Sequence, residues 1–153
     1  MTLIGIDPGT ACGWAILDSS GGRIASGTWD LRPRRHEGGG MRYLRVRQYV
    51  EALLSTPVGV RALAYEEVRR HAGTDAAHVY GGIVAMIAAV CEERKVPYMA
   101  IPVGTVKRHA TGKGNAPKEM MVSAASEHWA CEPCDDNEAD ALWIASALRA
   151  ELA

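Results

Sequence analysis

Short apolar runs separated by turn residues dominate the first thirty positions of the chain. The run that ends at Asp7 is rich in Leu and Ile, and Pro8-Gly9-Thr10 follows it directly. Because Pro cannot donate a hydrogen bond within a sheet, this pattern predicts a buried strand that ends at a turn. Two further runs, over residues 13–18 and 23–29, flank a Ser-Ser-Gly-Gly turn and predict a β-hairpin.

The middle of the chain alternates between helical spacing and strand spacing. Apolar residues predict a helix over residues 41–54, with Leu44 on its buried side and arginines on the other. A second buried strand, over residues 60–68, ends in Glu66-Glu67, whose side chains must point to opposite faces. Residues 77–95 predict a long apolar helix, which we interpret as a core helix, with a dimer contact as the alternative.

The last third of the chain predicts one short strand and three helices. The strand covers residues 97–101, and helices follow over residues 103–111 and from 116 to about 129. The final helix begins near Asp135, which has the spacing of a capping box with Glu138. This order of elements is typical of a mixed α/β fold, with a five-stranded sheet flanked by helices.

Length and composition favour one domain over residues 1–153. The chain has no run of eighteen apolar residues and no basic-then-apolar leader, so we expect a cytoplasmic protein without a membrane partner. His128, Cys131 and Cys134 have a spacing that would hold zinc if a fourth ligand came from elsewhere. Cysteines in a turn before a helix are the simpler interpretation of this segment.

Total charge identifies no partner, because 17 Lys and Arg stand against 18 Asp and Glu. The distribution is uneven: residues 32–47 hold six arginines opposed by Glu37, and acidic residues gather over residues 127–140. A second basic segment contains Lys107, Arg108, Lys113 and Lys118. A basic rim around an acidic centre fits a metal-dependent enzyme on a polyanion, and a solvated charged surface is the alternative.

Four carboxylates are candidates for one polar site. Asp7 and one of Glu66 or Glu67 come at the carboxyl ends of strands that would lie side by side in a parallel pair. Asp136 and Asp140 are one helical turn apart, where like charges repel unless a cation lies nearby. Hard divalent cations prefer such oxygen ligands, and two ions about 4 Å apart cleave phosphodiesters in known two-metal sites. Alternatively, Asp7 binds only the amides of its own turn.

Four segments in order resemble the RuvC family of Holliday-junction resolvases. They are residues 4–10 (IGIDPGT), residues 64–68 (AYEEV), residues 106–118, and residues 136–145 (DNEADALWIA), which together span nearly the whole chain. The resemblance implies an RNase H-like fold, a homodimer, and a cofactor of Mg²⁺ or Mn²⁺ with two ions per active site. It also implies an endonuclease that makes paired nicks in four-way DNA junctions during recombination and repair.

The resemblance also implies roles for particular residues. By position, Asp7, Glu66 and Asp140 match catalytic metal ligands, while Lys107 and Lys118 match basic residues near the cut strand. The family commonly has an acid or His where this chain has Asn137, so we assign the fourth ligand to Asp136 and keep Asn137 as the alternative. The full set of candidate DNA-binding residues is Arg69, Arg70, Lys107, Arg108, Lys113 and Lys118.

Other features leave the substrate open. Arg69 occupies the position where bacterial resolvases carry an aromatic residue, and the chain contains no Phe. Its length is closer to that of the phage members, whose substrate range looks broader, so a general debranching nuclease is one alternative. A catalytically inactive junction-binding module is another. Residues 5–10 also resemble the phosphate loop of actin-like and sugar-kinase ATPases, although a second Asp-Gly-rich phosphate motif is missing from the sequence.

Overall fold

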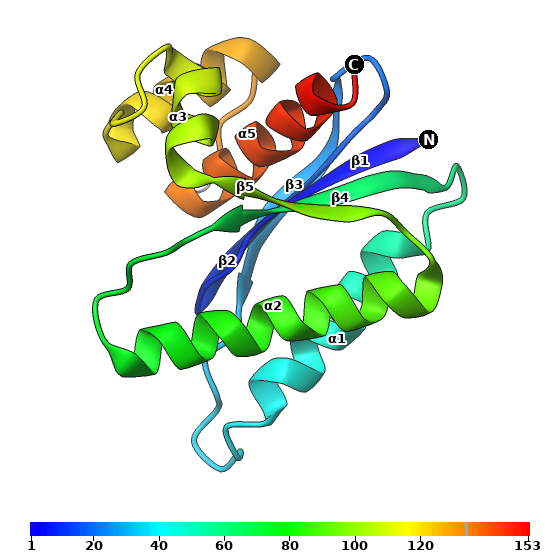
Figure 1. Cartoon of the computed structure of the whole chain (residues 1–153), viewed down its shortest axis with the longest axis vertical. Helices are drawn as coiled ribbons and strands as arrows, with labels where there is room; N and C mark the ends of the chain where they lie inside the picture. Colours follow the sequence, from blue (N-terminus) through cyan, green and yellow to red (C-terminus); the bar gives the residue numbers. More distant parts are fainter. Residues whose placement is uncertain (134) are drawn as a thin grey trace.

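The computed structural model describes residues 1–133 and 135–153, which form a mixed five-stranded sheet between two layers of helices (Figure 1). The strands lie in the order β3-β2-β1-β4-β5. β1 pairs with β2 in antiparallel and with β4 in parallel orientation, so the carboxyl ends of β1 and β4 lie side by side. The strands are β1 (Thr2–Asp7), β2 (Ala11–Leu17), β3 (Arg23–Asp30), β4 (Val60–Glu67) and β5 (Tyr98–Pro102).

Two helices cover one face of the sheet and three cover the other (Figure 1). The first group is α1 (Met41–Leu54) and α2 (Thr74–Arg94). The second group is α3 (Val103–Thr111), α4 (Lys118–Trp129) and α5 (Asp136–Glu151). The predicted mixed α/β fold is therefore confirmed, and the bounds of most elements differ from the prediction by only a few residues.

Helix α5 packs directly on the backbone of the sheet. Two glycines permit this approach: a Cβ added to Gly5 would lie 2.2 Å from the carbonyl oxygen of Ala141. A Cβ added to Gly13 would lie 1.9 Å from the carbonyl oxygen of Asn137. No real side chain tolerates such distances, so α5 reaches β1 and β2 only because both positions are Gly. This close contact sets the position of the acidic residues at the start of α5.

The predicted buried side of α1 is wrong at its first turn. Leu44 is 45% exposed, whereas Arg45 is only 9% exposed. The reason is a tertiary ion pair: the guanidinium of Arg45 binds the carboxylate of Glu37, which the preceding loop folds back onto the helix. Of the remaining apolar positions, Tyr49 is half-buried, and the others are buried as the helical spacing predicts: Val46, Val50, Leu53 and Leu54.

Helix α2 is buried along only one stripe, so the prediction of a core helix holds for that stripe and not for the whole helix. The buried residues of α2 are Ile83, Ile87, Val90 and Cys91. Gly82 packs on α1, where an added Cβ would lie 2.3 Å from the Tyr43 ring. Within the described chain, α2 is also the one helix long and apolar enough to cross a membrane, judged by length and composition alone. The sequence criterion of eighteen consecutive apolar residues missed this property.

Candidate active site

Asp7 and Glu66 meet at the carboxyl end of the sheet. The register between β1 and β4 pairs Ile6 with Tyr65, so the following residue of each strand lies beside the other. The two carboxyl groups lie close enough that each affects the pKa of the other. Burial, and then the charge of Glu66, raise the pKa of Asp7 well above its usual range. Burial also raises the pKa of Glu66, opposed by the hydrogen bond from Asp7 and the charge of Lys107.

A tyrosine from α2 fixes the main chain that carries Glu66. The hydroxyl of Tyr80 donates to the carbonyl oxygen of Glu66 at 2.8 Å and accepts from the amide of Val68 at 3.1 Å. The sequence analysis did not identify Tyr80 as a site residue. A signal was present, because a tyrosine hydroxyl in an otherwise apolar helix needs a polar partner.

The N-terminus of α5 supplies the other two carboxylates. Asp135 is the N-cap, as predicted, and accepts a hydrogen bond from the amide of Glu138 at 2.9 Å. Asp140 lies one turn into the helix, where burial, and then the charges of Glu66 and Asp136, raise its pKa to about 7. All four candidate carboxylates therefore act on one another electrostatically at one end of the sheet.

Asp136 and Asn137 have different environments. The charge of Asp136 acts on both Asp7 and Asp140, and its carboxylate lies 3.4 Å from the ammonium group of Lys118. The main-chain carbonyl of Asn137 instead lies against the glycine of β2. Asp136 therefore acts electrostatically on the other carboxylates of the site.

The chemistry of the cluster fits a hard divalent cation. All donors are carboxylate oxygens, and a divalent counter-ion would relieve the repulsion between these buried acids. Over residues 1–133 and 135–153, no three His, Cys, Asp or Glu side chains are gathered closely enough to form a ready-made metal site.

The proposed zinc segment is described only in part. His128 packs against the rings of Trp129 and Trp143, at centroid distances of 4.5 and 5.3 Å. Cys131 is a free, half-buried thiol. Cys134 lies outside the described residues.

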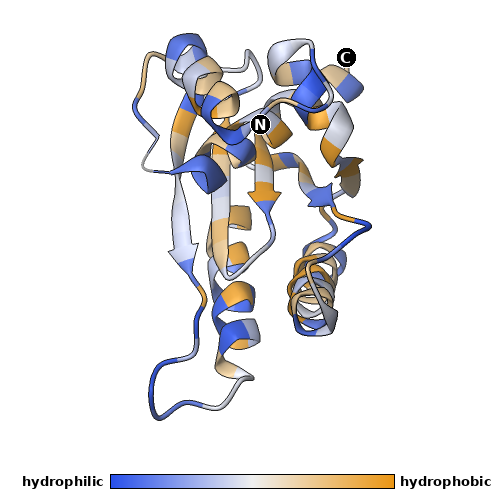
Figure 2. Ribbon diagram, turned by 90° about the vertical axis from the view of Figure 1, so that its left-hand side faces the viewer, coloured by the Kyte–Doolittle hydropathy of each residue, from blue (hydrophilic) through white to orange (hydrophobic). Residues whose placement is uncertain are grey.

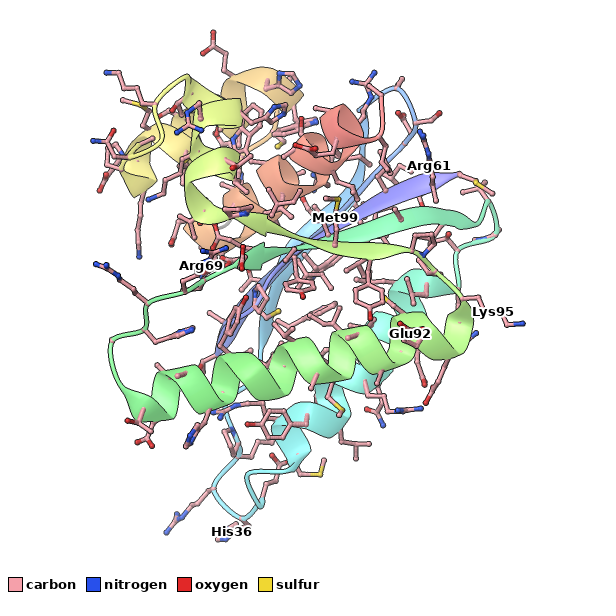
Figure 3. All side chains as sticks on the ribbon, in the orientation of Figure 1. His36, Arg61, Arg69, Glu92, Lys95 and Met99 are labelled. Carbon is pink, nitrogen blue, oxygen red and sulfur yellow. The ribbon has the colours of Figure 1, made fainter. Side chains whose placement is uncertain are left out.

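The basic candidates lie at different distances from the carboxylates. The charges of Lys107 and Lys118 both act on Asp140, so these two residues belong to the site. Arg69 forms an ion pair with Glu67 at 3.3 Å, and its side chain is 82% exposed beyond the end of β4 (Figure 3). Three others, Arg70, Arg108 and Lys113, are exposed at the surface.

A cavity of about 520 Å³ opens beside the turn that follows Asp7. Its walls include Pro8, Gly9 and Thr10 from this turn and Arg42 from α1. His71 and Tyr80 line it from the side of α2. The sequence analysis identified neither this cavity nor a role for Arg42, because both depend on how α1 and α2 pack against the turn.

The sheet order, together with acids on β1, β4 and α5, defines an RNase H-like nuclease domain. Comparison with known proteins is more specific. A model described as crossover junction endodeoxyribonuclease RuvC matches residues 3–147, and the chain belongs to the RuvC family. This assignment replaces the ATPase interpretation of residues 5–10.

Individual relatives agree with this family. The RuvC of Rhodococcus jostii (strain RHA1) is 31% identical over 155 residues, covering 95% of this chain and 79% of the relative. The RuvC of Anaeromyxobacter sp. (strain Fw109-5) is 29% identical over 149 residues, covering 95% and 71%. The structure of Thermus thermophilus RuvC in complex with Holliday junction substrate aligns with a TM-score of 0.80 and 25% identity, covering 96% of this chain and 92% of that chain.

Proposed function

We propose that this protein is a metal-dependent endonuclease that resolves four-way DNA junctions, with Asp7, Glu66, Asp136 and Asp140 as the ligands of two Mg²⁺ or Mn²⁺ ions. The observation that supports this most strongly is the convergence of four carboxylates from β1, β4 and α5 beside two lysines. The family match over residues 3–147 extends across all the elements that carry them.

The residues of this site would act mainly by position and charge. When bound, the ions would activate a water molecule and stabilise the leaving oxygen of a phosphodiester. Lys107, whose charge acts on Glu66 and Asp140, would meet the scissile phosphate on the side of α3. Lys118 would exchange its ion pair with Asp136 for a DNA phosphate. Burial of Asp7 and Glu66 limits water at the reacting centre and strengthens each of these interactions.

A symmetric junction needs two active sites, so we propose a homodimer that works in the cytoplasm on DNA. Helix α2 offers a surface for this contact. Gly81 and Ala85 are exposed, Val84 and Ala88 are only half-buried, and an added Cβ at Gly81 would meet nothing within 4 Å. Small apolar residues of this kind allow two helices to pack closely across a two-fold axis.

The decisive experiment uses labelled four-way, three-way and linear DNA with Mg²⁺, Mn²⁺ or EDTA, followed by mapping of the nicks. Symmetric, metal-dependent nicks confined to the four-way junction support the proposal. Cutting of every branched substrate would instead identify a broader debranching nuclease. Junction binding without any cutting by the folded protein would identify an inactive binding module.

The variant Asp7→Asn tests the carboxylate assignment. We expect cleavage to fall by about two orders of magnitude or more, the scale for removing one group that stabilises transition-state charge. Junction binding in EDTA should persist because the basic residues are unchanged. Glu151→Gln, the corresponding change from carboxylate to amide at the exposed C-terminal end of α5, is the matched control and should cleave at the wild-type rate. Wild-type cleavage by Asp7→Asn would exclude this site.

The variants Lys107→Ala and Lys118→Ala test contact with the DNA backbone. Each should weaken junction binding and reduce the slope of log affinity against log salt by about one. Binding measured over a series of salt concentrations gives this slope. An unchanged slope would remove the residue concerned from the DNA interface.

A further inference from the structure

The six arginines of residues 32–47 fall into two groups in the folded protein. Three are engaged in ion pairs: Arg32 with Asp30 at 2.7 Å, Arg45 with Glu37, and Arg47 with Glu93 at 2.6 Å. The other three, Arg34, Arg35 and Arg42, have no ion pair with any residue that the structure describes. Arg34 and Arg35 are also exposed to solvent. The sequence alone makes all six look equivalent.

The loop that carries these residues, the arginine arm (residues 31–40), is held in place by its own contacts. Glu37 holds the arm against α1. Its carboxylate accepts hydrogen bonds from the amide of Arg34 at 2.9 Å and from the guanidinium of Arg45 at 2.8 Å. Leu31 is fully buried, and its amide donates to the carbonyl oxygen of Thr10 at 2.8 Å. The arm is therefore fastened at one end to the turn after Asp7 and at the other end to α1.

The arm leaves the sheet at the same end as the carboxylates. β3 pairs Asp30 with Ala11, so the chain enters the arm beside the turn that follows Asp7. Figure 2 shows the arm as a hydrophilic loop that extends beyond the sheet, and His36 marks its outer end in Figure 3. Arg42 donates to the carbonyl oxygen of Leu31 at 3.1 Å and lines the cavity beside the turn. Its charge thus lies between the arm and the carboxylate cluster.

Positive charge consequently flanks the carboxylates on both faces of the sheet. Lys107 and Lys118 lie on the face covered by α3, α4 and α5, whereas Arg42 lies on the face covered by α1 and α2 (Figure 1). A DNA strand that crosses the carboxylates would therefore have phosphates to either side of the cut near a basic group. Guanidinium groups suit this role because they bind phosphate oxygens in pairs.

We propose that Arg34, Arg35 and Arg42 form a second, pre-positioned DNA-binding surface that holds the duplex arm of a junction on the α1 side of the cut. This inference rests on the proposed function and adds a substrate requirement to it. DNA must extend beyond the active site in both directions for full affinity.

The first test is junction binding in EDTA by the double variant R34A/R35A. Its salt slope should be smaller than that of the wild type by about one for each arginine that contacts a phosphate. R47A is the matched control, because Arg47 is already paired with Glu93, and its slope should equal that of the wild type. A wild-type slope for R34A/R35A, or an equal decrease for R47A, would overturn the proposal.

The second test is E37Q, for which two models predict opposite results. If the arm were flexible and attracted DNA only by its net positive charge, removing the negative charge of Glu37 would strengthen DNA binding. If Glu37 pre-positions the arm, its loss releases Arg34 and Arg45 and weakens junction binding despite the more positive charge. Weaker binding by E37Q supports the proposal, and binding equal to or stronger than wild type contradicts a positioned arm.

Binding and cleavage by the wild-type protein distinguish a failure of this inference from a failure of the proposed function. A wild type that neither binds nor cuts junctions would refute the function itself. A wild type that cuts junctions, with R34A/R35A retaining the wild-type slope, would refute only the role of the arm. Shortening one junction arm at a time adds a final check: one truncation should weaken the wild type but leave R34A/R35A unchanged.

Discussion

The two faces of the sheet are built in different ways. On the α5 face, helix backbone rests on strand backbone at Gly5 and Gly13, so little relative movement is possible. On the α1–α2 face, larger side chains such as Ile83 and Ile87 separate helix from sheet, and much of α2 stays exposed. The rigid face carries two of the four carboxylates, whereas the other face carries the arginine arm and the proposed dimer contact.

The acidic residues of the two regions also have different environments. Asp7 and Asp140 have raised pKa values because burial and neighbouring acids disfavour their charge. Near the arm, the hydrogen bond from Arg45 lowers the pKa of Glu37 to about 2, and that from Arg32 lowers the pKa of Asp30 to about 2. The carboxylate region therefore favours the binding of cations, whereas near the arm the acids Asp30 and Glu37 are already paired with arginines. A metal site needs acids that have no positive partner, whereas a fixed DNA-binding surface needs acids that are paired with the residues they hold in place.

The largest expected effect comes from Gly13→Ala on the rigid face. The new Cβ would lie 1.9 Å from the carbonyl oxygen of Asn137, so α5 must shift, with a loss of about 3 kcal/mol in the free energy of unfolding. Gly104→Ala in α3 is the matched control, because its Cβ would meet only the carbonyl oxygen of Gly114, at 3.8 Å, and it should stabilise α3 by about 0.5–1 kcal/mol. Urea denaturation measures both. Equal effects of the two substitutions would contradict the comparison of the faces.

The second effect is the response of stability to metal. Asp7→Asn should raise the stability of the metal-free protein by about 0.5–2 kcal/mol, because it removes a buried, repelled carboxylate. Saturating Mg²⁺ should stabilise the wild type by about 2.7 kcal/mol at 100 times the dissociation constant, and the variant far less. Thermal melts with Mg²⁺ and with EDTA test this. A variant that keeps the full Mg²⁺ response would show that the ion binds elsewhere.

A smaller effect is expected from Tyr80→Phe, which removes the hydroxyl that holds the main chain at Glu66. We expect a loss of about 0.5–1.5 kcal/mol in stability and a higher Mg²⁺ concentration for half-maximal cleavage. Tyr98→Phe is the control, since its hydroxyl bonds Glu92 at an exposed site and has no contact with the carboxylates. A wild-type Mg²⁺ requirement for Tyr80→Phe would limit Tyr80 to a structural role.

The smallest expected effect is the pH dependence of the stability that the pairing of Glu37 with Arg45 contributes. The pKa of Glu37 in the folded protein is about 2, below its ordinary value of 4.5, mainly through the hydrogen bond from Arg45. The pairing therefore stabilises the protein above about pH 4.5 and is lost as the pH falls toward 2. The difference in stability between wild type and Glu37→Gln should shrink over this range. A difference that is constant from pH 7 to 3 would show that the pairing contributes nothing.

Much of the fold could be predicted because local patterns were unambiguous. Apolar runs that end in acids predicted β1 and β4, the pattern of apolar residues predicted α1, α2 and α5, and turn and Pro signals predicted α3 and α4. The prediction of buried residues was wrong where a residue outside the helix changed the environment. Arg45 is buried and Leu44 is exposed because Arg45 forms an ion pair with Glu37. The helical spacing carries no information about an ion pair formed with a preceding loop.

The candidate site could be predicted as a set of residues but not as an arrangement. Acids at the ends of two strands and at the start of one helix indicated which side chains would meet, since strand ends and helix N-termini are fixed by local sequence. Tyr80 and Arg42 were missed because their roles depend on how α1 and α2 lie against the ends of β1 and β4. Packing between segments distant in the sequence sets these contacts.

The sequence by itself determined the order of elements, the candidate carboxylates and the resemblance to the RuvC family, because all three depend on residue types at fixed spacing. The tertiary structure decided which of six similar arginines remain available to a partner. It also decided how closely α5 approaches the sheet. Ion pairing and close packing depend on distances of a few ångströms between segments far apart in the chain, and only the folded backbone sets those distances.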